Sequence, residues 1–143
     1  MTTVVVDATV ALKWCLPAAR EEFVPQAEAL LASYRREEIR FLVPDLFWVE
    51  VANALWKAAR RTEISSADAM SAMSLVRDLD IPTVPSYDLL PQALILAMAH
   101  GRTVYDILYV ALAMQSKSEM VTADERLANA MAARLPVKWL GAF

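Results

Sequence analysis

Short, apolar, β-branched runs alternate with longer helical patterns along the chain, and this alternation limits the fold more than any other feature of the sequence. The first run is Thr-Thr-Val-Val-Val at residues 2–6, and the others lie at 41–43, 81–84, 119–122 and 137–140. The segments expected to be helical lie between these runs, at residues 8–16, 21–38, 45–60, 65–79, 88–100, 104–116 and 124–133. Strands that are joined through helices lie parallel, and the helices cover both faces of their sheet. We therefore expect an α/β fold with three α/β/α layers and a central, mostly parallel sheet of four to five strands.

The size and charge of the chain narrow the classes of protein further. Its 143 residues are enough for a sizeable core, and we expect a single domain over residues 1–143. Lys and Arg total 14 against 17 Asp and Glu, so binding of nucleic acid through bulk positive charge is not expected. The longest uncharged stretches, 89–101 and 107–116, are shorter than the roughly 18 apolar residues of a membrane-spanning helix. No secretory signal is readable, and the single Cys15 cannot form an internal disulfide, so we expect a soluble, cytoplasmic protein.

Four acidic residues stand among apolar residues, where a lone carboxylate is costly. They are Asp7, directly after three valines, Glu50 and Asp106, each the only charge in an apolar helical stretch, and Asp124, just after a predicted strand. An ionised carboxylate in such surroundings costs several kcal/mol unless it is paired or binds a cation. Few basic residues lie near these acids in the sequence, and oxygen ligands suit Mg²⁺ or Mn²⁺ better than Zn²⁺. The pattern therefore predicts a site for a hard divalent cation.

Each of these acids also has a simpler explanation when it is taken alone. A single aspartate after a strand is more commonly a helix cap or a turn residue, and Glu50 alone fits the polar rim of an apolar helix. Asp45 is likewise placed to cap the helix that follows it. Parallel sheets bind their ligands at the carboxyl ends of the strands, where Asp7 and Asp124 are expected. We therefore favour one shared metal site for the four acids.

The segments that carry the four acids form a recognisable pattern. They are VVDATVALKW at 5–14, PDLFWVEVANAL at 44–55, TVYDILYVALA at 103–113 and VTADERL at 121–127. Together, and in this order, they resemble the PIN-domain family, specifically the VapC-type toxins of bacterial and archaeal toxin–antitoxin pairs. Each segment is weakly specific alone, but four in order over nearly the whole chain are specific. The resemblance implies a three-layer PIN-like domain that is a metal-dependent endoribonuclease, hydrolysing RNA phosphodiesters at an acidic site.

The resemblance also assigns roles to particular residues. The positions that match the family's metal-binding and catalytic acids are Asp7, Glu50, Asp106 and Asp124. Thr9 and Thr122 match hydroxyl positions that orient water at the metal, and Asn53 matches a polar position that supports the site from behind the carboxylates. The implied cofactor is Mg²⁺ or Mn²⁺. Because none of the four acids is missing, an active enzyme is expected.

Partners are expected as well. The resemblance implies a VapB-like antitoxin that wraps the toxin and places a basic side chain near the acids, in addition to the RNA substrate. A homodimer is also expected, and Trp14, Trp48 and Trp56 are candidates for its interface, although core packing is the simpler assignment for most apolar residues. The arginines that are candidates for contacts with RNA phosphates are Arg35, Arg36, Arg40, Arg60, Arg61 and Arg102. For any single arginine, a solvated helix face is the simpler assignment.

Two other classes of function stay open. A magnesium-dependent phosphotransfer domain also places an aspartate at a strand end, but the haloacid dehalogenase type needs a second aspartate where Thr9 stands. The other alternative is a non-catalytic interaction module with the PIN fold, which the loss of one acid would favour.

Overall fold

The chain folds around one parallel sheet. The computed structural model describes the backbone of residues 1–143 and every side chain except that of Arg20. Five strands lie in the order β3-β2-β1-β4-β5, and every neighbouring pair is parallel. The strands are β1 (Thr2–Val6), β2 (Ile39–Pro44), β3 (Thr83–Val84), β4 (Glu119–Thr122) and β5 (Val137–Trp139). The helices are α1 (Ala8–Cys15), α2 (Val24–Arg35), α3 (Leu46–Arg60), α4 (Ser66–Asp78), α5 (Ser86–His100), α6 (Val104–Gln115) and α7 (Glu125–Met131), with short 3₁₀ turns at Ala18–Arg20 and Leu140–Ala142.

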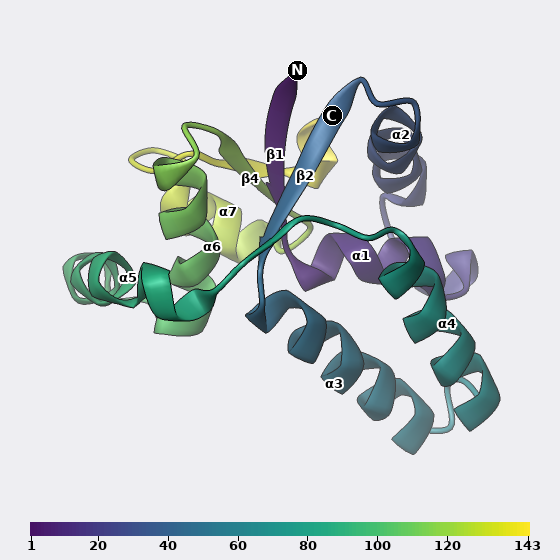
Figure 1. Cartoon of the computed structure of the whole chain (residues 1–143). Coiled ribbons are helices and arrows are strands. Elements are labelled where there is room, and N and C mark those ends of the chain that lie inside the picture. Colours follow the sequence, from purple (N-terminus) through teal and green to yellow (C-terminus); the bar gives the residue numbers. More distant parts are fainter.

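Helices pack on both faces of this sheet and form two groups. α6 packs across β1, β2 and β4, and α5 packs on α6. α1 contacts α2, α3 and α4, and Figure 1 shows this second group on the other side of the central strands. The predicted α/β class, with three layers and a central parallel sheet, is therefore confirmed.

The hydrophobic core is centred on β1 and α6. Val5 and Val6 of β1 are fully buried, as expected for the middle strand of a sheet covered on both faces. Every residue from Ile107 to Ala113 in α6 is buried, so this helix has no solvent-facing stripe over that stretch. Asp106 directly precedes the buried stretch. The core therefore holds this acid on a helix that has little freedom to move.

Two local predictions need correction. Asp45 does not cap α3 with its side chain, because its own backbone is already helical (φ −62°, ψ −23°) and its carboxylate points elsewhere. Its Oδ1 instead accepts hydrogen bonds from the backbone N–H of Ser86, at 3.1 Å, and from the Ser86 hydroxyl, which ties the start of α3 to the start of α5. The helix predicted over 21–38 is shorter, and it begins at Val24 because Phe23 has a left-handed backbone (φ 58°).

Of the three tryptophans considered for a dimer interface, two have internal partners. Trp14 stacks on Phe41 and donates its indole N–H to the Ala27 carbonyl at 2.8 Å. Trp48 donates to the Thr83 hydroxyl at 3.0 Å, whereas Trp56 is 55% exposed. Core packing therefore accounts for Trp14, and Trp56 stays available to a partner.

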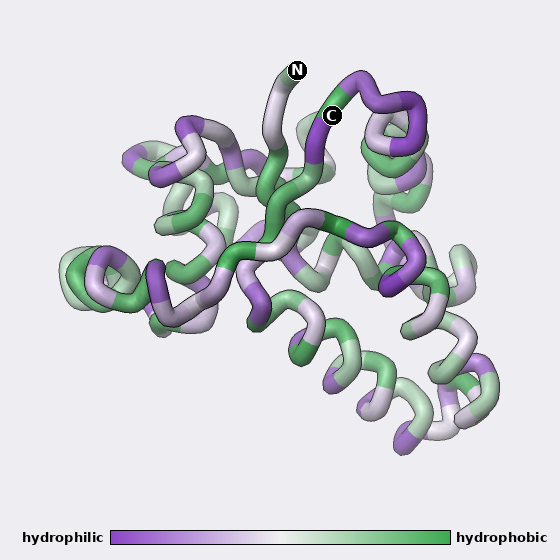
Figure 2. The backbone as a smooth tube through the Cα atoms, in the orientation of Figure 1, coloured by the Kyte–Doolittle hydropathy of each residue, from purple (hydrophilic) through white to green (hydrophobic). Residues whose placement is uncertain are grey.

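Hydrophobic residues also reach the surface. Figure 2 shows hydrophobic residues along the central strands and hydrophilic ones where α2 leads into β2. The outer face of α5 departs from this pattern, because it exposes Tyr87, Leu90, Leu94, Ile95 and Met98. In the part of the chain that the structure describes, no helix has the length and hydrophobicity needed to cross a membrane.

Candidate active site

The fold brings the four predicted acids to one edge of the sheet. Asp7 directly follows β1 and Asp124 follows β4 by two residues, and these parallel neighbours end at the same edge. Glu50 lies in the second turn of α3, and Asp106 lies in the first turn of α6. All four line one pocket of about 80 Å³, and the other lining residues are Ala8, Thr9, Tyr109, Met120 and Leu127. The predicted meeting of these acids at the carboxyl ends of the strands is therefore what the structure shows.

Asp7 is held rigidly at the centre of this site. Its side chain is almost completely buried and caps α1, with Oδ1 accepting the backbone N–H groups of Thr9 at 3.1 Å and Val10 at 3.3 Å. The Thr9 hydroxyl donates to the same oxygen at 2.5 Å, and the Thr122 hydroxyl donates to Oδ2 at 2.6 Å. The simple explanation of Asp7 as a helix cap is therefore correct, but it does not account for burial of the whole carboxylate.

The two threonines also connect the ends of β1 and β4. The Thr9 hydroxyl accepts the backbone N–H of Ala123 at 2.9 Å, and the Thr122 hydroxyl accepts the backbone N–H of Asp124 at 3.1 Å. A hydroxyl has one proton to donate, and both threonines give theirs to Asp7. Their observed contacts therefore position Asp7 and Asp124, and a direct contact with water at a metal stays a prediction.

Burial, with a smaller contribution from neighbouring charges, raises the pKa of three of the acids. Burial raises the pKa of Asp7 to about 6, against the hydrogen bonds from Thr122, Thr9 and Val10, and the charge of Glu50 adds to this rise. Burial likewise raises the pKa of Glu50, and the charge of Asp106 contributes. The pKa of Asp106 is also raised, first by burial and then by the charge of Asp124, against the lowering effect of Arg102. The four carboxylates thus form a continuous line of mutual repulsion.

Tyr109 also lines the pocket, although no sequence pattern singled it out. It is buried in α6, and its hydroxyl donates a hydrogen bond to Oε1 of Glu50. Burial and the charge of Glu50 raise the pKa of Tyr109, so it stays a neutral donor. A signal was present, because Tyr109 lies three residues after Asp106 and therefore on the same face of the helix.

Asn53 lies outside this arrangement. It is one turn beyond Glu50 on α3, but its side chain is exposed and it does not line the pocket. Its expected support of the site stays a prediction.

The donor set of the pocket is made of oxygen atoms alone. His100 and Cys15 do not line it, so the ligands that Zn²⁺ prefers are missing from its walls. In the described residues, no group of three or more Asp, Glu, His or Cys side chains is close enough to hold an ion together. Mg²⁺ commonly binds through one or two carboxylates and keeps several waters. The buried, mutually repelling carboxylates therefore fit a hydrated hard cation better than a closed protein cage.

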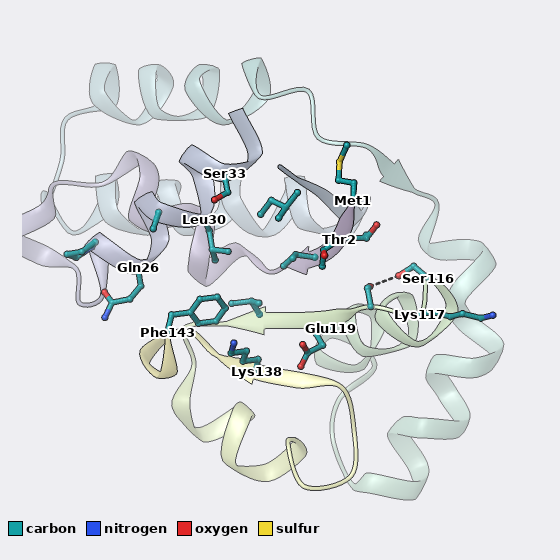
Figure 3. Close-up of a pocket in the computed structure, with 17 residues that line it drawn as sticks. Met1, Thr2, Gln26, Leu30, Ser33, Ser116, Lys117, Glu119, Lys138 and Phe143 are labelled. Atoms are coloured by element: carbon teal, nitrogen blue, oxygen red, sulfur yellow. Dashed lines mark hydrogen bonds between the residues drawn. The ribbon is translucent and has the colours of Figure 1, made fainter. Parts of the chain in front are cut away.

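A much larger cavity lies at the opposite edge of the sheet. It measures about 990 Å³ and surrounds the amino ends of β1 and β4, next to Met1, Lys138 and Phe143 (Figure 3). Glu119 is the single acid among its lining residues. Size alone would select this cavity, but it lacks the collected carboxylates of the smaller pocket.

Comparison with known proteins identifies the family of the chain. The PIN domain family model matches residues 4–132. The chain is 38% identical to Ribonuclease VapC3 of Pyrobaculum aerophilum over 127 residues, which cover 87% of this chain and 92% of that protein.

Solved structures share the fold at lower sequence identity. PAE2754 from Pyrobaculum aerophilum superposes with a TM-score of 0.70 at 20% identity, covering 99% of this chain and 91% of that one. VapBC2 from Rickettsia felis, solved bound to a DNA fragment from its promoter, has a TM-score of 0.64 at 9% identity, covering 96% of this chain and 98% of that one. The family match and the identity to VapC3 show that the chain belongs to the PIN-domain family and, within it, to the VapC ribonucleases, which confirms the family predicted from the four acidic segments.

Proposed function

We propose that this chain is a Mg²⁺- or Mn²⁺-dependent endoribonuclease, a single domain over residues 1–143, and the toxin of a VapBC-type pair. The observation that carries the proposal is the meeting of Asp7, Glu50, Asp106 and Asp124 around one small pocket at the carboxyl edge of the sheet. A relative that shares 38% identity is named a ribonuclease, which agrees with this chemistry. The proposed place of action is the cytoplasm, where cellular RNA is available.

In this proposal the four acids hold a hydrated cation, some of them through water, and keep it next to an RNA phosphodiester. When bound, the cation lowers the pKa of a water molecule and offsets negative charge on the leaving oxygen. Asp7 is fixed by four hydrogen bonds from Thr9, Val10 and Thr122, so its orientation does not change when a ligand arrives. Asp124 uses Oδ1 to accept the backbone N–H of Leu127 at 3.2 Å and thereby caps α7. Tyr109 holds one oxygen of Glu50, and both residues line the pocket.

The antitoxin and a second copy of the chain are the proposed protein partners. An acidic pocket favours a partner that brings a basic side chain to it. A VapBC assembly among the proteins of similar fold agrees with a VapB-like antitoxin. The exposed apolar face of α5, with Leu94, Ile95 and Met98, is the proposed surface for a homodimer, since contiguous apolar surface commonly marks an interface.

The direct test is cleavage of pooled cellular RNA by the purified, antitoxin-free chain in Mg²⁺, in Mn²⁺ and in EDTA. We expect cuts in either metal and none in EDTA. Asp106→Asn keeps the shape of the side chain and removes its charge, so it should abolish the cuts, whereas Asp78→Asn, on the exposed end of α4, should not.

Two results would contradict the proposal. Cleavage in EDTA would exclude the metal site. Absence of cleavage with both metals, together with no heat of Mn²⁺ binding in calorimetry, would favour the non-catalytic interaction module instead.

A further inference from the structure

Arg102 lies beside Asp106, one of the acids that line the pocket. Gly101 ends α5 with a left-handed backbone (φ 65°), and Thr103 caps α6, so Arg102 lies in a tight turn between the two helices. Its Nη2 atom lies 3.9 Å from Oδ2 of Asp106. Among the ion pairs of the described side chains, this is the one that involves an acid of the pocket.

The stability of the fold gives little reason for a cation at this position. Arg102 lies between the carboxyl end of α5, where the helix dipole favours positive charge, and the amino end of α6, where the dipole disfavours it, so the two dipoles oppose each other. Its Nε atom is buried without a hydrogen-bond partner in the described structure, which costs free energy. The ion pair with Asp106 is long, and its side chains are 30% and 43% exposed, so it contributes little. Because the side chain is partly exposed and its ion pair is weak, the Arg102 guanidinium can take a better acceptor from a ligand that arrives beside the acids.

The other candidate arginines have different surroundings. The Arg36 guanidinium pairs with Glu38 at 2.7 Å, and Arg60 lies 5.4 Å from the centre of the Trp56 ring. Arg40 lies in β2, in register with Thr3 near the amino edge of the sheet. Among the described side chains, none of these three forms an ion pair with an acid of the pocket, as Arg102 does.

We propose that Arg102 binds a phosphate oxygen of the RNA backbone next to the acid pocket. This inference rests on the proposed function, because it assumes that RNA enters there. A guanidinium presents adjacent N–H donors that match the oxygens of a phosphate, and a charged acceptor strengthens each hydrogen bond. A phosphate offers Arg102 a better acceptor than a half-exposed carboxylate at 3.9 Å. Arg102 is thus a substrate-positioning residue of this chain.

The test compares Arg102→Gln and Arg102→Lys with Arg77→Gln, a control at an exposed arginine of α4 that is not among the candidates for RNA contacts. Binding of a labelled RNA that contains a wild-type cleavage site is measured by fluorescence anisotropy in EDTA, which prevents cleavage. Arg102→Gln should weaken binding about tenfold. It should also lower the slope of log affinity against log salt by about 0.7, the value for one lost contact to a single strand. Arg102→Lys should recover part of the affinity, and Arg77→Gln should match the wild type.

Steady-state cleavage and metal binding separate substrate positioning from damage to the site. Arg102→Gln should raise KM, while its affinity for Mn²⁺ in calorimetry should be unchanged or higher, because a cation beside Asp106 is removed. Wild-type RNA affinity and salt slope in Arg102→Gln would overturn the inference, and so would a loss of Mn²⁺ affinity that parallels the loss of activity. Failure of the wild-type chain to cleave RNA would contradict the proposed function instead, and the anisotropy comparison would then test Arg102 on a labelled single-stranded RNA of mixed sequence.

Discussion

The two edges of the sheet differ in the side chains that they bring together. The amino edge opens into a cavity of about 990 Å³ lined by a mixture of apolar, hydroxyl and lysine side chains. The carboxyl edge has a pocket of about 80 Å³ into which four carboxylates converge. Burial raises the pKa of Asp7, Glu50 and Asp106 at this edge, so the arrangement costs folding free energy. Carboxylates with raised pKa values commonly occur where a ligand binds or a reaction takes place. The gathered carboxylates therefore indicate the active site better than the volume of the cavity does.

The most direct test of this difference between the two edges replaces one glutamate at each edge with glutamine. Glu50→Gln removes a carboxylate from the small pocket, and Glu119→Gln removes the single acid that lines the large cavity. We expect Glu50→Gln to lower cleavage of RNA by roughly a thousandfold, because the pocket loses negative charge where a cation binds. Glu119→Gln should leave the rate within about twofold of the wild type. Initial rates on one RNA substrate test this, and a large loss in Glu119→Gln would move the chemistry to the amino edge.

A second prediction concerns Tyr109, which holds Glu50 in place at the carboxyl edge of the sheet. Tyr109→Phe removes the hydroxyl that donates to Glu50 and keeps the buried ring. Loss of a group that orients a metal-binding side chain typically costs about 10- to 100-fold in metal affinity or activity. We expect a loss of this size in both Mn²⁺ affinity, measured by calorimetry, and cleavage rate. Tyr105→Phe is the matched control on the same helix, since Tyr105 is 65% exposed, and an equal loss in both variants would contradict a specific role for Tyr109.

Much of this arrangement was readable from the sequence because it depends on local patterns. Alternating strands and helices predict a parallel sheet, and a parallel sheet gathers the residues that follow its strands at one edge. Asp7 and Asp124 therefore met as expected. Glu50 and Asp106 were recognisable because each interrupts an apolar helix, where an unpaired charge is costly.

The remaining features depend on contacts between distant segments. Asp45 follows a local rule for helix caps, but its partner Ser86 lies 41 residues away in the sequence. Tyr109 donates a hydrogen bond to Glu50, which lies 59 residues earlier in the sequence, and no spacing rule predicts that contact. The order of the strands and the distance between Arg102 and Asp106 likewise follow only from the packed structure. The sequence therefore located the acids and the two threonines that hold Asp7, but not Tyr109, which holds Glu50.

The smallest expected effect concerns the cost of the buried charge at Asp7. Because burial raises its pKa to about 6, the folded protein binds a proton there more tightly than the unfolded chain does. Stability should therefore increase as the pH falls through this pKa, by about 1 kcal/mol between about pH 7.5 and about pH 5. Asp7→Asn should lack this share of the pH dependence and be more stable than the wild type at the higher pH, because asparagine keeps the cap without the charge. Urea unfolding in EDTA at both pH values measures the difference between the two proteins. A variant that is less stable at the higher pH would show that the hydrogen bonds to Asp7 contribute more to the free energy of unfolding than the burial of its charge removes. The carboxyl edge would then lower the stability of the fold no more than the amino edge does.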